Sequence, residues 1–351
     1  MRESVAVVGA TGFVGRELLK RLQAEGVPVS AVVRGAPELV AGNGFHAVHL
    51  PEARDRRFRT VVNLAYPTSG PPFTYPEQNA AMLRTVDGLL EDGGHLVHVS
   101  TQAVFGALLD RPVEPGPVRR RRDDPYVEAK IDAEVHFCDH QPKRGWSVDI
   151  VRLGNVWGRG SGSWGVPLVQ RLLTGRPVGV HGREGFSNTT DIANTTSYLS
   201  HLIHRDDVSP GIRYHHVAEF SSVPWREWVL ATAEAMGVSP VYAQAKSLSP
   251  PRPLDAVSIR GVYRALAERP VSGSWVRSGL RLLPDDLRTR LKGTGGGPAQ
   301  AVPMDHTERM YVAIMATAQD FVSVVDDGWT PVVTREESLS RYLSWVRGWD
   351  A

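Results

Sequence analysis

The chain has 351 residues, enough for two structural lobes with a sizeable core. Its 40 Lys and Arg nearly balance 38 Asp and Glu, so no strong net charge favours nucleic acid or an anionic membrane as a partner. The one cysteine cannot form an internal disulfide, and neither a signal peptide nor a long apolar run is visible, so we expect a cytoplasmic protein with a small-molecule partner.

The first readable feature is a strand, a glycine-rich turn and a helix. Residues 5–8 are continuously apolar, residues 9–15 have glycines at a G-x-x-G-x-x-G spacing, and residues 14–22 repeat apolar side chains at helical spacing. Glycine suits such a turn because the backbone needs unusual φ angles and must approach a pyrophosphate closely, while the helix N-terminus attracts the anion. The pattern predicts a dinucleotide site whose members are Gly9, Thr11, Gly12, Phe13, Val14 and Gly15.

The next predicted strand, residues 29–33, ends directly at Arg34. In an NAD-specific site, a carboxylate at the end of this strand accepts hydrogen bonds from the ribose hydroxyls, whereas an arginine can pair with the 2′-phosphate of NADP. Neither position 33 nor position 34 is acidic. We expect a preference for NADP, with NAD as the alternative cofactor. The competing interpretation is that Arg34 is merely exposed to solvent.

The following segments lead to the edge of the predicted sheet formed by the carboxyl ends of its strands. The weakly patterned stretch 36–59 contains one candidate strand at residues 46–50, and residues 60–65 form a short buried strand. That strand ends in Leu64 and Ala65, where the backbone could run beside a cofactor. A loop rich in Pro and Gly follows at residues 66–75, then a helix at residues 76–92 that Gly93 and Gly94 end.

The strand at residues 95–99 delivers Thr101 to this edge, and a helix carries Tyr126 and Lys130 four residues apart on one face. A tyrosine hydroxyl can exchange protons near pH 7 only if its pKa falls by about 3 units, or about 4 kcal/mol. A neighbouring ammonium favours the phenolate. Lys130 can also hydrogen-bond a nicotinamide ribose, and Thr101 can hold the substrate oxygen against the tyrosine. Taken alone, a Tyr and a Lys four residues apart on a helix are commonly exposed to solvent and have no catalytic role.

Three motifs in this order resemble the signatures of the extended short-chain dehydrogenase/reductase family, also called the NAD-dependent epimerase/dehydratase family. They are residues 9–15, residues 100–106 and residues 126–130, with Thr101 25 residues before Tyr126. Asn79 and Glu134 also fall where the family pattern has them. The resemblance implies that Thr101, Tyr126 and Lys130 are catalytic. By the same resemblance, Arg34 matches the end of the corresponding strand in the NADP-using reductases of the family.

The resemblance implies an α/β fold, a Rossmann-type doubly wound parallel sheet with a smaller, mainly helical C-terminal substrate-binding region. We expect the NAD(P)-binding domain at residues 1–158, with segments near residues 178–220 returning to it. Residues 159–351 would form most of the substrate-binding region. A helix at residues 166–174, a strand at 178–180, and a closing helix with a Thr334–Glu337 capping box are predicted there, whereas residues 247–300 are hard to read.

Several residues become candidates for contact with the substrate. Asn155 lies in a segment similar to the family's R-x-x-N motif, although an Asn after a strand is often only a turn former. Arg183 is offset by about one residue from the arginine that meets the diphosphate in nucleotide-sugar members, so the resemblance leaves open whether the substrate carries a nucleotide diphosphate. The substrate-binding candidates are Thr101, Gln102, Asn155 and Arg183.

The remaining signals limit the choice of function. No metal site is expected, because His215 and His216 are adjacent on a strand and point to opposite faces. A 4,6-dehydratase is disfavoured, since such members of the family follow the active-site Thr with Asp-Glu, whereas Gln102 and Ala103 stand here. An NADPH-using ketoreductase acting on a sugar-like or secondary-metabolite carbonyl is favoured over an NAD-dependent sugar epimerase. A non-catalytic dinucleotide sensor or scaffold is the alternative of another class, and a homodimer is a further candidate partner.

Overall fold

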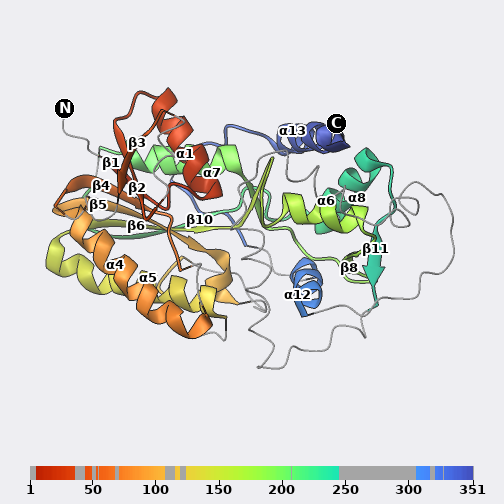
Figure 1. Ribbon diagram of the computed structural model, residues 1–351, viewed down its shortest axis with the longest axis horizontal. Coiled ribbons are helices and arrows are strands. Elements are labelled where there is room, and N and C mark those ends of the chain that lie inside the picture. The colour runs from red at the N-terminus through yellow and green to blue at the C-terminus, as the bar shows by residue number, and fades with distance from the viewer. Residues whose placement is uncertain are drawn as a thin grey trace. The chain divides into compact units, whose positions relative to one another are not determined.

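A computed structural model describes residues 5–35, 44–49, 53, 55–67, 71–106, 115–118, 124–206, 208–244, 306–316, 321–326 and 328–350 (Figure 1). The chain forms two compact units. The first unit combines Met1–Trp157, Ser187–Val223 and Gln319–Ser338, and the second combines Gly158–Phe186, Pro224–Ala318 and Leu339–Ala351. Residues 247–300, which are hard to read in the sequence, lie outside the described residues.

A seven-stranded parallel sheet in the order β10-β6-β5-β4-β1-β2-β3 forms the centre of the first unit. Its strands are β1 (Val5–Val8), β2 (Val29–Val33), β3 (His46–His49), β4 (Phe58–Asn63), β5 (Leu90–Thr101), β6 (Ser147–Leu153) and β10 (Gly211–Val217). After β1 the chain builds outward to β2 and β3, then returns to place β4 on the other side of β1. Such a reversal opens a crevice at the carboxyl ends of the strands, so the predicted doubly wound fold is confirmed.

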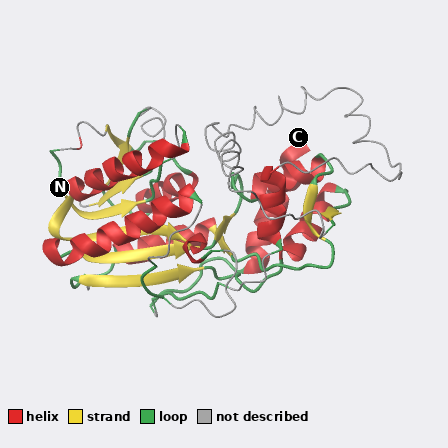
Figure 2. Ribbon diagram, turned by 90° about the horizontal axis from the view of Figure 1, so that it is seen from below, coloured by secondary structure: helices red, strands yellow, loops and turns green. Residues whose placement is uncertain are grey.

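Helices cover both faces of this sheet. Helices α1 (Phe13–Ala24) and α7 (Ile192–Ile203) lie on one face, and α4 (Tyr75–Leu89) and α5 (Pro125–Arg144) lie on the other (Figure 1). Val5 and Val7 of β1 pack into the first core, and Ala6 and Val8 pack into the second. The strands are therefore apolar at nearly every position, as expected for a parallel sheet buried on both sides. Figure 2 shows the strands of the sheet in yellow with the helices in red.

One boundary differs from the sequence prediction. The helix predicted to reach residue 92 ends at Leu89, and β5 begins at Leu90 rather than at residue 95. Leu90 is fully buried and pairs with Phe58, and the register then shifts before Thr60 pairs with His95. Gly93, with a φ of +67°, lies in this irregular stretch, so the two glycines bend a strand rather than separate a helix from one.

The other elements of the first unit are short. They are η1 (Pro72–Thr74), η2 (Gln102–Phe105), β7 (Asn155–Trp157) and β9 (Thr189–Asp191). Strands β7 and β9 pair in parallel.

The second unit has mostly helices among its described residues. They include α6 (Gly165–Leu173), α8 (Trp225–Met236) and α12 (His306–Met315), together with a parallel pair formed by β8 (Pro177–Val180) and β11 (Val241–Ala243). The predicted helix and strand after residue 165 are thus confirmed.

The C-terminal helix α13 (Arg335–Arg347), followed by η5 (Gly348–Asp350), begins with the predicted capping box: Glu337 N–H donates to Thr334 Oγ1, and Thr334 N–H donates to Glu337 Oε2. Among the described helices, none combines the length and the apolar character needed to cross a membrane.

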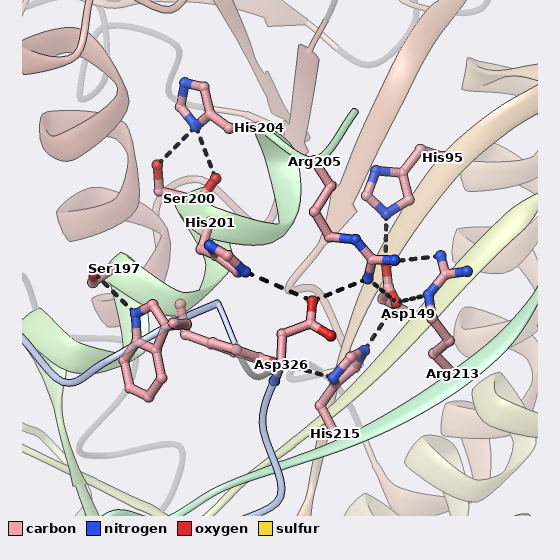
Figure 3. Close-up of polar contacts among 12 residues, drawn as sticks. His95, Asp149, Ser197, Ser200, His201, His204, Arg205, Arg213, His215 and Asp326 are labelled. Atoms are coloured by element: carbon pink, nitrogen blue, oxygen red, sulfur yellow. Dashed lines mark hydrogen bonds and ion pairs between the residues drawn. The ribbon is translucent and has the colours of Figure 1, made fainter. Parts of the chain in front are cut away.

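A buried polar network lies on the α7 face of the sheet around Asp149 of β6 (Figure 3). His95 of β5 and His215 of β10 contact its carboxylate through Nε2 at 2.6 and 2.9 Å, and Arg213 Nε donates to it at 2.7 Å. The Tyr198 hydroxyl of α7 lies 2.6 Å from His215 Nδ1 and accepts a hydrogen bond from the Asp326 backbone N–H. Burial alone would raise the pKa of Asp149, but hydrogen bonds from the two histidines and Arg213 hold that pKa well below its usual range.

Candidate dinucleotide and catalytic site

The glycine turn fits a close backbone approach at two positions. Gly9 has a φ of +88°, and a Cβ there would lie 2.8 Å from the backbone nitrogen of Ala65. A Cβ on Gly15 would lie 2.8 Å from the Cα of Ala10 and would also meet the Gly9 carbonyl oxygen. The turn is therefore pressed against the end of β4 on one side and against its own helix on the other. This contact places Leu64 and Ala65, two predicted cofactor residues, beside the turn.

The N-terminus of α1 is open to an anion. Gly12 is the N-cap residue, no side chain caps the helix, and its first turn contains no acidic residue. Thr11 and Gly12 are exposed, and the Arg16 guanidinium donates to the Thr11 carbonyl oxygen at 2.5 Å. Unpaired N–H groups at a helix N-terminus bind phosphate well, so the residues present fit the pyrophosphate of a dinucleotide.

Arg34 extends from the end of β2, the strand beside β1. Its side chain is exposed and forms no ion pair within the described part of the chain. Its backbone carbonyl accepts a hydrogen bond from His49 Nε2 at 3.0 Å, which fixes the strand end against β3. The role of its guanidinium stays a prediction.

The catalytic candidates lie at neighbouring element ends in the first unit. Thr101 is the last residue of β5, and its Oγ1 accepts the Ala103 N–H at 3.3 Å to start η2, which contains Gln102. Helix α5 starts at Pro125, because the Asp124 carboxylate accepts the N–H groups of Tyr126 and Val127 at 2.8 and 3.1 Å.

Apolar contacts join these two element ends. Side chains of η2 and of the first turns of α5 form one small hydrophobic cluster that contains Val104, Phe105, Val127 and Ile131. The cluster brings the Thr101 end of β5 and the Tyr126 turn of α5 together, although they are 25 residues apart in the sequence.

Lys130 is buried one helical turn after Tyr126. Its side chain is 3% exposed, and its Nζ donates to the Val99 carbonyl oxygen at 2.8 Å. Burial lowers the pKa of Lys130 from 10.5 to about 7, against the opposing effect of the Glu134 carboxylate. An ammonium has three donors, so this hydrogen bond leaves two N–H groups for a ribose hydroxyl.

Tyr66, which is not among the predicted site residues, contacts both Tyr126 and Lys130. Its ring centroid lies 4.9 Å from that of Tyr126 in an edge-to-face arrangement, and Lys130 Nζ lies 5.1 Å from it. Tyr66 directly follows Leu64 and Ala65 at the carboxyl end of a predicted strand, where ligands bind. This position is the sequence signal that could have identified it as a site residue.

A second set of residues holds Glu134 behind Lys130. Ser100 Oγ donates to Glu134 Oε1 at 2.5 Å, and Arg152 donates to both carboxylate oxygens, at 3.0 Å through Nε and 2.6 Å through Nη2. Arg152 is fully buried and was not among the predicted site residues. Asn79 Nδ2 of α4 donates to the Ala129 carbonyl at 3.0 Å, which ties α4 to the helix that contains the pair. These contacts fix the part of α5 that contains Lys130.

The two remaining substrate candidates stay predictions. Asn155 begins β7, and its Nδ2 donates to the Ser187 carbonyl at 2.7 Å, so at least one of its donors serves the backbone. Arg183 belongs to the second unit, where its side chain is exposed and its backbone N–H donates to the Val180 carbonyl at 3.2 Å.

Sequence comparison finds two curated reductases among the relatives of this chain. One, from Stigmatella aurantiaca, is a 4-hydroxy-2-methyl-3-oxo-4-farnesyl-3,4-dihydroquinoline-1-oxide ketoreductase, 24% identical over 249 residues that cover 66% of this chain and 73% of the relative. Another, from Streptomyces sp, is a dTDP-4-dehydro-6-deoxy-D-allose reductase, 29% identical over 189 residues that cover 45% and 57%.

Comparison with solved structures gives a likeness along almost the whole chain. MoeE5, solved in complex with UDP-glucose and NAD, superposes with a TM-score of 0.62 at 20% identity and covers 99% of this chain and 100% of its own. At this identity the likeness shows the fold alone. The model of the NAD dependent epimerase/dehydratase family matches residues 5–197, more than half of the chain. With its glycine turn, its sheet order and this match, the chain belongs to the NAD-dependent epimerase/dehydratase family.

Proposed function

We propose that the protein is an NADPH-using ketoreductase that acts on a sugar-like or secondary-metabolite carbonyl. Its family and its curated relatives support the broader class of NAD(P)-dependent oxidoreductases and epimerases. The observation that carries the proposal is the buried Lys130 one helical turn after Tyr126 on α5, with its Nζ on the Val99 carbonyl near the end of β5. A lysine is costly to bury, and such perturbed groups cluster at functional sites.

Each residue has a defined part in the proposed reaction. A bound nicotinamide cofactor would supply the hydride for the carbonyl carbon. Tyr126 donates its hydroxyl proton to the carbonyl oxygen, and Thr101 orients that oxygen. Lys130 binds the ribose through its remaining N–H groups and, when protonated, lowers the pKa of Tyr126 by favouring the phenolate.

Replacing Tyr126 by Phe tests the reductase. We expect NADPH consumption with a panel of sugar-linked and free ketones to fall by about 10²–10⁴-fold, because the proton donor is lost. The Kd for NADPH should stay unchanged, since the ring remains packed against Tyr66. Tyr75→Phe, which changes a tyrosine at the start of α4, serves as the control.

Three results would contradict this proposal in different ways. Full activity in Tyr126→Phe would remove the tyrosine from the reaction. If the wild type interconverts sugar epimers with no net consumption of NADPH, the protein is an epimerase. Tight NADPH binding with no turnover on any ketone would favour the sensor.

The NADP preference is proposed from the exposed Arg34 guanidinium at the end of β2, where no carboxylate stands at positions 33–34. Arg34→Ala should raise the Kd for NADPH by about tenfold or more and leave the Kd for NADH unchanged, because a charge-assisted contact to the 2′-phosphate is lost. Arg59→Ala, which removes an exposed arginine near the start of β4, is the matched control. An unchanged ratio of the two Kd values in Arg34→Ala would place Arg34 outside the site.

A further inference from the structure

Three potential metal ligands meet between α4 and α5, apart from the Tyr-Lys pair. Asp87 belongs to α4, and His136 and His140 lie one turn apart on α5. One ligand atom from each of the three side chains lies within 4.8 Å of the other two. Two imidazoles at this helical spacing face the same side of a helix, so both can reach one ion.

The hydrogen bond of His140 prepares it for a metal. Its Nδ1 lies 2.8 Å from the His136 carbonyl oxygen. A carbonyl can only accept, so Nδ1 carries the proton and the neutral ring keeps a free electron pair on Nε2. Metal-bound histidines usually donate their other ring N–H to a carbonyl in this way, which fixes tautomer and orientation.

His136 and Asp87 supply the other two potential metal ligands. His136 Nε2 lies 2.9 and 3.1 Å from the two Asp87 carboxylate oxygens, and its ring stacks on that of His140 with centroids 4.0 Å apart. The two side chains are 20% and 17% exposed, and His136 lines a groove of about 330 Å³ between the two helices. An ion can therefore reach the three groups from solvent.

A second carboxylate contacted by two histidines does not offer the same chemistry. Asp149 also contacts His95 and His215, but Arg213 Nε donates to it and Arg205 Nη1 lies 3.5 Å from it. A cation there would face two guanidinium groups. Among the described residues, the α4–α5 cluster is thus the one group of three or more such ligands whose geometry allows a shared ion.

We propose that Asp87, His136 and His140 bind one divalent transition-metal ion such as Zn²⁺, with water completing the coordination. Two imidazoles and one carboxylate favour zinc, cobalt, nickel or copper over calcium or magnesium. Ligand atoms on one tetrahedral zinc ion are about 3.3 Å apart, so small side-chain rotations close the observed spacing. To bind the metal through Nε2, His136 takes the neutral tautomer with its proton on Nδ1, and the Nε2 proton exchanges with solvent as the metal binds. The ion would join α4 to α5 and stabilise the first unit.

The test titrates the full chain with Zn²⁺ in a calorimeter and with Co²⁺ in a spectrophotometer. We expect one ion per chain, a visible Co²⁺ spectrum of low-coordinate geometry, and a rise in Tm with Zn²⁺. His140→Ala should weaken binding by at least about tenfold, since it removes a direct ligand. The same variant keeps the Asp87–His136 contact, so its fold should be intact.

The control variant is His204→Ala. His204 makes a similar contact, from Nδ1 to the Ser200 carbonyl at 2.9 Å, but belongs to no ligand cluster among the described residues. It should bind Zn²⁺ like the wild type, whereas Asp87→Asn and His136→Ala should both lose affinity. No binding at millimolar Zn²⁺, or equal binding by His140→Ala and the wild type, would overturn the proposal. Because NADPH turnover uses none of these residues, failure of the reductase would leave this result unaffected.

Discussion

At the scale of single residues, Lys130 combines burial with a charge that the proposed chemistry needs. Its Nζ has one backbone acceptor, and the nearest compensating carboxylate, Glu134, is already bound by Arg152 and Ser100. The residue is therefore expected to lower stability while it serves catalysis, a trade-off common at active sites.

Lys130→Met should show this trade-off directly. The pKa of Lys130 falls from 10.5 in the unfolded chain to about 7 in the folded protein, so between pH 7 and 10.5 the unfolded state binds more protons. Wild-type stability consequently rises with pH across this window, by at most about 1.4 kcal/mol per pH unit. We expect Lys130→Met to be more stable than the wild type at pH 7, by a margin that shrinks toward pH 10.5, and to lose turnover.

Urea unfolding at several pH values measures that margin. Lys20→Met is the matched control, because the Lys20 side chain is 59% exposed and pairs with Glu17 on the surface. Its stability should follow the wild type within about 0.5 kcal/mol at each pH. A constant difference between Lys130→Met and the wild type would contradict the lowered pKa.

At the scale of elements, the sequence predicted the features that depend on residues close together in the chain. The strand, turn and helix of residues 5–24 follow from periodicity, and Tyr126 and Lys130 lie on one helix, α5, as their four-residue spacing predicted. Tyr66 could not be predicted as their neighbour. Its approach depends on how β4, β5 and α5 pack, and no local pattern encodes that packing. The start of β5 at Leu90 was missed for the same reason, since its pairing with Phe58 is a long-range contact.

Replacing a glycine by alanine should have opposite effects in the glycine turn and in α4. Gly15→Ala places a methyl group against backbone atoms of Gly9 and Ala10, which cannot move without separating β1 from α1. We expect it to cost about 1–3 kcal/mol of stability and to weaken dinucleotide binding. Gly88→Ala in α4 meets no atom within 4 Å and should stabilise the protein by about 0.5–1 kcal/mol. Thermal unfolding and NADPH titration of both variants provide the measurement, and similar behaviour of the two would contradict the close approach.

At the scale of the first unit, the Asp149 network holds together segments from distant parts of the sequence (Figure 3). It links β5, β6, β10, α7 and Asp326, the last through Tyr198 and through Arg205 Nη1 at 3.2 Å. The network lies toward the strand starts, since Asp149 is only the third residue of β6, whereas Thr101 ends β5. We therefore expect its role to be structural, away from the proposed catalytic residues.

Asp149→Asn should test this role. Removing the charge leaves two arginines and two histidines around a buried neutral amide, which is expected to cost about 3–5 kcal/mol at pH 7. The Asp92 side chain is 78% exposed and pairs with Arg144 on the surface. Asp92→Asn should therefore lower the free energy of unfolding by less than about 1 kcal/mol. The lowered pKa of Asp149 stabilises the folded state above the ordinary range of an aspartate, and that stabilisation is lost as pH falls toward the lowered value. In the wild type, the Asp149 carboxyl carbon should accordingly show no NMR titration step between pH 7 and about 3. A step near the ordinary aspartate value would mean that the histidines and Arg213 do not hold the carboxylate as the structure has it.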